Sequence, residues 1–178
     1  MRAQILDGRA VSATILDGVR KEVGEFVAEH GRVPVLATVL VGDDPASHTY
    51  VRMKAHRCAK VGMESHRIEL DADITTAELV GRVRELSDDP AVDGILLQHP
   101  VPRQIDERAA FEAITPGKDV DGVTRTSFAT MAFGEGGFDS VTPGGIMAHM
   151  PATRVMSDSP PRPSARPSSR RCPAGSGP

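Results

Sequence analysis

The sequence predicts an α/β domain with a mostly parallel sheet flanked by helices. Segments of strand character alternate with segments of helical character, the clearest strand is apolar along its whole length, and capping and turn residues stand between the segments. A strand that is apolar throughout is buried on both faces, which is typical of parallel sheets. Connections between parallel strands are nearly always right-handed, so we expect right-handed crossovers here.

The first expected element is an amphipathic helix of about 20 residues. An apolar side chain recurs at every fourth position, at Val11, Ile15, Val19, Val23 and Val27. This spacing places the five side chains on one side of a helix. Gly31 follows and suits the helix end, because glycine adopts the left-handed backbone conformation without strain.

The next two elements are the buried strand and a helix that follows it directly. Residues 35–41 form the continuous apolar run and are rich in β-branched side chains. Asp43 or Asp44 can cap the next helix, and Pro45 fits its first turn, where a missing N–H costs nothing. We expect this helix to run to about residue 60 and to stop at the glycine that follows.

The remaining elements continue the alternation. Residues 63–70 alternate partly and predict a second strand, and the capping-box spacing of Thr75 and Glu78 opens a helix. A third strand is expected over 93–97 and a short helix over 106–114. Residues 142–145 look like the start of another helix.

Composition limits the partners and the compartment. The formal net charge of −3 does not favour nucleic acid or an anionic membrane as a partner. No apolar run approaches the length of a membrane span, and we see no secretory signal. The two cysteines, Cys58 and Cys172, and the six histidines show no metal-binding or redox spacing, so we expect no metal and a cytoplasmic protein.

The chain divides in composition near residue 150. Residues 1–150 have a net charge of −7, whereas residues 151–178 have a net charge of +4 and hold 7 of the 14 prolines. A segment so rich in Pro, Ser and Arg buries too little apolar surface to offset its ordering entropy, so we predict disorder over 151–178. This tail is either a basic interaction arm or the out-of-frame translation of a GC-rich gene, the reading we favour.

Three segments at predicted strand ends or in a nearby loop carry candidate chemistry, since ligands bind beyond the carboxyl ends of parallel strands. Tyr50 and Lys54 share one helix face, so the ring can stack on a flat heterocycle while the amine acts as acid or base. Gln98 ends a strand, just before Pro100, and its amide can both donate and accept. The alternative is a packing Tyr, a surface Lys and an amide that binds backbone.

Asp119 and Asp121 lie in a loop between turn residues. A carboxylate there can accept hydrogen bonds from the amino and ring N–H groups of a ligand such as a pterin. The alternative is an Asx turn, in which the side chain binds its own backbone.

In register, these segments resemble the bifunctional methylenetetrahydrofolate dehydrogenase/cyclohydrolase family. VGDDPASHTYVRMKAHRCAKVG resembles its Tyr-x-x-x-Lys helix, DGILLQHPVPRQID its Gln-containing strand end, ITPGKDVDGV its KDVDG loop, and SVTPGGI the start of its CTPxG helix. The likeness spans roughly residues 3–150 and predicts a folate-binding catalytic domain over 1–150. Val141 stands where the family usually has Cys.

The resemblance implies roles for the candidate residues. Lys54 would be the catalytic residue, Gln98 would pair with it, and Tyr50 would stack on the folate. Asp121 would anchor the pterin with Asp119 close by, and Pro100 would also belong to the substrate-binding residues. The family oxidises 5,10-methylenetetrahydrofolate with a nicotinamide cofactor, usually NADP, hydrolyses the methenyl product to 10-formyltetrahydrofolate, and typically forms homodimers.

One departure from the family pattern affects the expected activity. The Rossmann-type domain that follows the CTPxG helix in the family, with its Gly-Arg-Ser phosphate loop, is not found in this sequence, so we expect no cofactor-binding residues and loss of the dehydrogenase step. Three alternatives follow: a domain that keeps cyclohydrolase activity, a module that binds folate without turnover, or an inactive fragment with exposed apolar surface.

Overall fold

The computed structural model describes residues 7–134 and confirms the predicted α/β class. Its three strands form one parallel sheet in the order β2-β1-β3. In chain order the elements are α1 (Gly8–His30), β1 (Val35–Val41), α2 (Pro45–Val61), β2 (Glu64–Leu70), α3 (Thr76–Asp88), β3 (Gly94–Leu97), α4 (Glu107–Phe111), the 3-10 helix η1 (Pro116–Lys118) and α5 (Arg125–Phe133).

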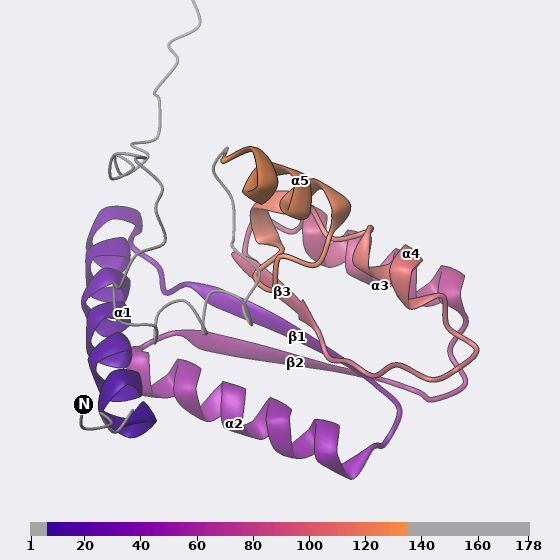
Figure 1. The fold of residues 1–178 in the computed structure, drawn as a ribbon, viewed down its shortest axis with the longest axis horizontal. Helices are drawn as coiled ribbons and strands as arrows, with labels where there is room; N and C mark the ends of the chain where they lie inside the picture. The colour runs from indigo at the N-terminus through magenta and orange to yellow at the C-terminus, as the bar shows by residue number, and fades with distance from the viewer. Residues whose placement is uncertain (1–6, 135–178) are drawn as a thin grey trace, which may run out of the picture.

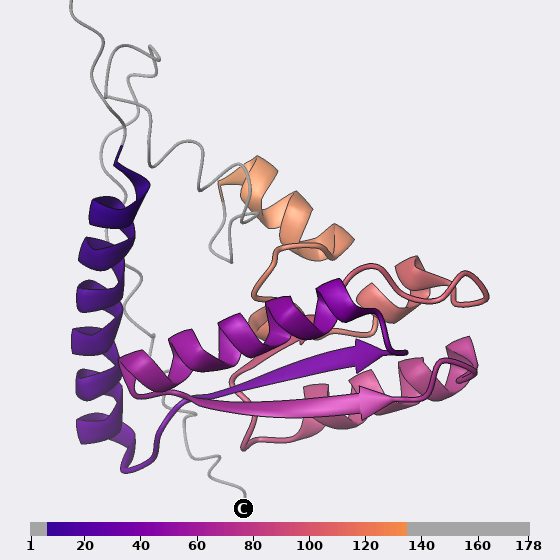
Figure 2. The same ribbon diagram turned by 90° about the horizontal axis from the view of Figure 1, so that it is seen from below.

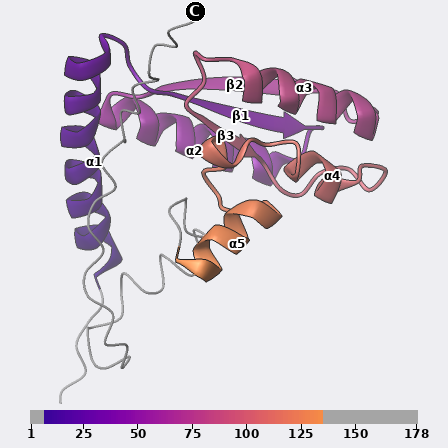
Figure 3. The same cartoon turned by 90° about the horizontal axis from the view of Figure 1, so that it is seen from above.

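Helices cover both faces of the sheet, as Figures 1 and 2 show. Helix α2 lies on one face, and α3 lies on the other with α4 near its end. Helix α1 stands across the amino ends of the strands (Figure 2), and α5 lies apart from the sheet beyond β3 (Figure 3). The carboxyl ends of the strands therefore point away from α1.

The central strand β1 is buried on both faces, as its apolar run predicts. Val39 pairs with Ile68 of β2 on one side and with Leu97 of β3 on the other. The main core packs the alternate residues of β1 against α3, with Leu79 and Val83 fully buried. This packing holds β1 and β3 side by side in a fixed register. It therefore also holds the carboxyl ends of the two strands, where the candidate site lies.

The helix ends are set by the predicted residues. Of the two carboxylates considered for α2, Asp44 is the cap, and it accepts a hydrogen bond from Ser47 N at 2.7 Å. Gly62 ends α2 with a φ of 88°. Thr75 and Glu78 form the reciprocal capping box that starts α3.

Two helices differ from the prediction. Helix α1 has the predicted extent, but only Val23 of its apolar stripe is buried, and Ile15 is 51% exposed. The reason is that α1 contacts α2 and not a face of the sheet. Helix α5 was not predicted at all, although Thr124 caps it by accepting a bond from Ser127 N.

Several predictions lie outside the described residues, namely the helix start at 142–145, the tail over 151–178 and the role of Cys172.

Cys58 is buried with a free thiol, and burial raises its pKa. Within residues 7–134, no helix is both long and apolar enough to cross a membrane. In the same part of the chain, no cluster of three or more His, Cys, Asp or Glu side chains is arranged to hold a metal ion.

Candidate functional site

Lys54 and Gln98 meet at the carboxyl end of the sheet. Lys54 lies in α2, and its Nζ donates to Oε1 of Gln98 at 3.4 Å. Gln98 follows the last residue of β3, and its backbone N–H continues the sheet by donating to Val39 O at 2.8 Å. Both side chains are half-buried. The structure therefore brings together an amine and an amide that are 44 positions apart in the sequence.

The amide of Gln98 has a defined orientation. Its Nε2 donates to the backbone carbonyl of His99 at 2.7 Å, which leaves Oε1 directed to Lys54. His99 is in turn joined to Glu107 of α4 at 2.5 Å, and it precedes Pro100 through a cis peptide bond. The side chain of Pro100 is exposed, so it is available to a ligand but makes no contact that defines a role.

Tyr50 lies one helical turn before Lys54 on α2. Its side chain is 59% exposed, which is unusual for a large aromatic residue. A packing role, the alternative considered from the sequence, does not fit this exposure. An open aromatic face beside an amine suits stacking on a flat ring.

Asp121 is half-buried in the loop after η1. Burial raises its pKa above the usual range, the charge of Lys54 acts in the opposite direction, and the charge of Asp119 raises it further. The charge of Lys54 therefore favours the ionised form of the Asp121 carboxyl. No hydrogen bond joins Asp121 to Lys54 or Gln98 among the described residues.

Asp119 has a different environment from Asp121. Its side chain is completely buried, and its oxygens accept hydrogen bonds from Val123 N, Thr124 N and the hydroxyl of Ser127. Burial alone would raise its pKa, but these bonds together lower it. This geometry gives no support to direct substrate contact by Asp119 and resembles the Asx-turn alternative.

Sequence reasoning missed the residues that pack this loop. A Cβ atom on Gly94 would lie 2.6 Å from Cγ1 of Val120, so only glycine lets the loop approach β3 this closely. Thr124 and Ser127 complete the hydrogen bonds around Asp119. Two sequence signals could have indicated these residues. Gly94 opens a strand, which suggests a close approach of another segment, and Thr124 and Ser127 have the spacing of a helix cap.

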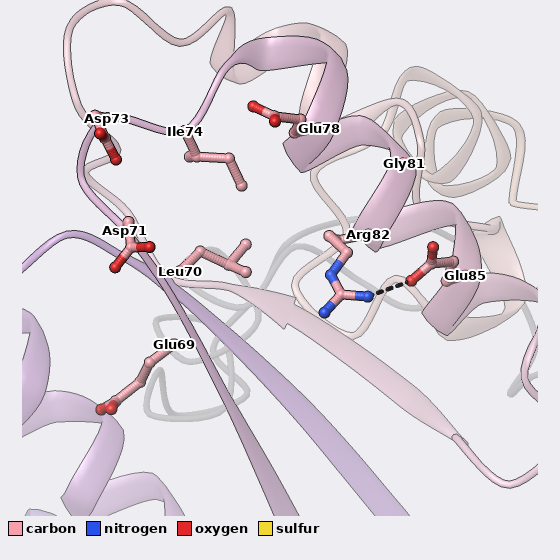
Figure 4. Close-up of a pocket in the computed structure, with 9 residues that line it drawn as sticks. All are labelled: Glu69, Leu70, Asp71, Asp73, Ile74, Glu78, Gly81, Arg82 and Glu85. Atoms are coloured by element: carbon pink, nitrogen blue, oxygen red, sulfur yellow. Dashed lines mark hydrogen bonds and ion pairs between the residues drawn. The ribbon is translucent and has the colours of Figure 1, made fainter.

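A separate hollow of about 610 Å³ lies between the end of β2 and α3. Figure 4 shows that its lining is mainly acidic, with Arg82 bonded to Glu85. The lining carboxylates are Glu69, Asp71, Asp73, Glu78 and Glu85. It contains none of the predicted site residues, and its charge disfavours an anionic ligand.

At the helix N-termini of residues 7–134, several backbone N–H groups that could hold a phosphate already have a partner. A dinucleotide binds with its pyrophosphate on free N–H groups at a helix N-terminus. Here a carboxylate already accepts one backbone N–H at each of three helix starts. Asp44 does so at α2, Glu78 at α3 and Asp106 at α4. At α5, Asp119 accepts from the backbone N–H of Thr124, the residue before the helix, and Glu112 accepts from Arg125 N. The negative charge at these helix N-termini disfavours a phosphate there.

Comparison with known families agrees with this geometry. Residues 6–121 match the sequence profile of the tetrahydrofolate dehydrogenase/cyclohydrolase catalytic domain. The chain belongs to this family. The matched range contains the Lys54–Gln98 pair and the loop of Asp121. The resemblance inferred from the motifs is therefore confirmed at the level of the family, which comprises bifunctional methylenetetrahydrofolate dehydrogenases/cyclohydrolases of one-carbon folate metabolism.

Relatives in the tetrahydrofolate dehydrogenase/cyclohydrolase family are close in sequence. The chain is 59% identical over 155 residues to bifunctional protein FolD 1 of Salinispora arenicola, covering 87% of this chain and 56% of the relative. It is 51% identical over 155 residues to bifunctional protein FolD of Cellvibrio japonicus, covering 87% and 55%. The chain thus spans a little over half the length of these relatives.

Solved FolD structures share the fold. The Campylobacter jejuni FolD enzyme superposes with a TM-score of 0.77 at 38% identity, covering 81% of this chain and 51% of that one. The Trypanosoma brucei FolD enzyme, solved with NADP cofactor and an inhibitor, gives a TM-score of 0.76 at 31% identity, covering 83% and 51%.

Proposed function

We propose that this chain binds a reduced folate between Tyr50, Lys54, Gln98 and Asp121, and that it hydrolyses 5,10-methenyltetrahydrofolate to 10-formyltetrahydrofolate. The Lys54–Gln98 contact at 3.4 Å is the observation that carries the proposal, because it places an oriented amine at the strand ends where ligands bind. The Campylobacter jejuni FolD enzyme, which shares this fold, is named a methylenetetrahydrofolate dehydrogenase/cyclohydrolase.

The residues suit each step of this hydrolysis. The methenyl carbon is already electrophilic, so water needs only positioning and proton transfer. The water oxygen bonds to that carbon, the bond from the carbon to N5 breaks, and the oxygen becomes the carbonyl of the formyl group. Of the two protons of the water, one is delivered to N5 and the other is released to solvent, which balances the positive charge of the methenyl substrate. Lys54 relays the proton to N5, and Gln98 holds its amine in place. Tyr50 stacks on the ring system, and Asp121 accepts hydrogen bonds from the pterin.

We infer that residues 7–134 contribute the folate half of the dehydrogenase reaction and not the nucleotide half. The family's cofactor, usually NADP, supplies the hydride acceptor when it is bound. The carboxylates at the helix N-termini of this part of the chain disfavour its phosphates there. We therefore expect no NADP-dependent oxidation by the 178-residue chain. The divisions at residue 150, a homodimer and a cytoplasmic location stay predictions.

One observation favours folate binding without turnover as the second candidate. Helix α5 exposes Phe128 at 62% and Phe133 at 80%, close in sequence to the Asp121 loop. Large exposed aromatic side chains are typical of surfaces that another domain, a partner protein or a ligand covers. If that cover completes the catalytic cleft, the chain alone binds substrate and does not convert it.

The test is NADP-free hydrolysis of 5,10-methenyltetrahydrofolate by the purified chain. Lys54→Met removes the amine, and Lys60→Met is the matched control because Lys60 is exposed in the last turn of the same helix. We expect turnover above the uncatalysed rate in the parent and in Lys60→Met, and none in Lys54→Met. Rates equal to the uncatalysed rate in all three proteins would refute the hydrolase proposal, and folate binding in that case would support the second candidate. Equal rates above the uncatalysed rate would remove Lys54 from the mechanism.

A further inference from the structure

The buried carboxylate of Asp119 organises the residues that follow Asp121. Its Oδ1 accepts from Val123 N at 3.1 Å, and its Oδ2 accepts from Thr124 N at 2.9 Å. The hydroxyl of Ser127 also donates to Oδ2, at 2.6 Å. No part of the Asp119 side chain is exposed. The Asp119 carboxylate is therefore part of the folded core of the loop, and its hydrogen-bonding capacity is used by the protein's own groups and not by a ligand.

The backbone of Asp119 fixes the loop on its other side. Its carbonyl accepts from Gly122 N at 3.2 Å, and Asp119 forms a parallel bridge with Ile95 of β3. Three consecutive residues after Asp121 thus donate their N–H groups to Asp119. The Asp121 side chain makes no hydrogen bond within residues 7–134, so its position follows from the backbone that carries it.

We propose that Asp119 is a positioning residue: its carboxylate holds the turn that carries Asp121 and so sets where the Asp121 carboxyl meets the folate. The proposal deepens the proposed function and rests on it for the role of Asp121. It assigns to the first carboxylate of the KDVDG loop a task different from that of the second. The first is bound by its own chain, and the second is left free for the ligand.

The charges around Asp121 support this arrangement. The charged groups that act on it are Lys54 from α2 and Asp119 from its own loop. Hydrogen bonds keep Asp119 ionised despite its burial, and its charge raises the pKa of Asp121. Asp119 therefore acts on Asp121 both through the backbone and through space.

The first measurement needs no folate. The Asp121 carboxyl is titrated by carbon-13 NMR in the full chain and in Asp119→Asn, with Asp89→Asn as the matched control. Asp89 also accepts a local backbone bond, from Ala91 N at 2.8 Å, but lies in the turn after α3. We expect the Asp121 midpoint to move to lower pH in Asp119→Asn and to stay in place in Asp89→Asn.

Ser127→Ala keeps the proposal testable if Asp119→Asn does not fold. This change removes one hydroxyl that donates to Asp119 and leaves both carboxylates in place. A looser loop admits water to Asp121, so the midpoint moves in the same direction. An unmoved Asp121 midpoint in every folded variant would overturn the proposal.

The second measurement adds the ligand, 5-formyltetrahydrofolate, in a double-mutant cycle. We expect Asp119→Asn to weaken binding about tenfold in the parent and to have little further effect in Asp121→Asn. Equal losses in both backgrounds would mean a general loss of structure and would overturn positioning through Asp121. If the parent binds no folate while the midpoint still moves, the proposed function fails and the coupling between the two carboxylates stands.

Discussion

Lys54 Nζ lies 3.4 Å from Gln98 Oε1, and this contact joins the middle of α2 to the end of β3. The two elements belong to different layers, one to a helical face and one to the sheet (Figure 1). The contact therefore depends on the packing of α2 on the sheet. A change in the position of either layer alters the distance between Lys54 and Gln98.

Replacing Gln98 tests the amide. Gln98→Met keeps the length of the side chain and removes the acceptor for Lys54, so we expect hydrolysis to fall about 100-fold. Gln104→Met is the control, because Gln104 donates to the carbonyl of Ala72, away from Lys54. Initial rates of methenyltetrahydrofolate hydrolysis measure both. A Gln98→Met rate equal to that of the control would remove Gln98 from the mechanism.

Tyr50 allows the stacking role to be separated from its hydroxyl group. We expect Tyr50→Ala to weaken binding of 5-formyltetrahydrofolate by about 1 kcal/mol, the usual worth of an aromatic pair. Tyr50→Phe keeps the ring and should bind like the parent. Isothermal titration calorimetry gives the three dissociation constants. If Tyr50→Phe loses as much as Tyr50→Ala, the hydroxyl and not the ring makes the contact.

Gly94 controls how closely the Asp121 loop packs on β3. A methyl group there meets Val120 at 2.6 Å, so we expect Gly94→Ala to lower the free energy of unfolding by about 1–3 kcal/mol. Gly18→Ala is the matched change, since nothing lies within 4 Å of its added Cβ in α1. It should stabilise the chain by about 0.5–1 kcal/mol. Urea unfolding followed by circular dichroism measures both, and a neutral Gly94→Ala would show that the loop moves freely.

Asp93 gives a stability that depends on pH. A hydrogen bond from Arg32 is the main cause that lowers its pKa, burial opposes this, and Val35 N contributes a further bond at 2.8 Å. A carboxyl with a lowered folded pKa stabilises fully above its unfolded pKa of about 3.9 and loses that contribution as the pH falls through the folded value.

We therefore expect Asp93→Asn to lower the free energy of unfolding by about 1 kcal/mol at neutral pH, and by progressively less below about pH 4. Asp17→Asn is the control, because its pair with Arg20 is exposed. Unfolding in urea at several pH values measures the difference. If the difference in the free energy of unfolding between the parent and Asp93→Asn does not become smaller in acid, the lowered pKa of Asp93 is not the cause of the stabilisation.

Much of the fold follows from local signals in the sequence. The apolar run of β1 predicts its central place, because no other environment buries both faces of a strand. Asp44, Pro45 and the Thr75–Glu78 box start their helices where the sequence indicates. Helix α5 was missed because apolar residues occur all around it, so no helical stripe separates them from polar ones.

The candidate site was predicted less completely, for a physical reason. Asp119 and Asp121 are the same residue type in one short loop, and spacing cannot tell which carboxylate turns inward. That choice depends on the backbone of residues 122–124, whose N–H groups face Asp119. The close approach of Val120 to Gly94 likewise depends on tertiary packing, which a single sequence does not display.

The strand order β2-β1-β3 also has a consequence during synthesis. Once a nascent chain has passed Leu70, β1 can pair with β2, but the partner for its other edge ends only at Leu97. At translation rates of about 5–20 residues per second, that edge stays open for roughly 1–5 seconds. The buried strand β1 thus has unpaired backbone groups in this interval, a state in which strands of other chains can add to it. Chaperone capture of ribosome-bound chains should therefore peak between the emergence of β2 and that of β3.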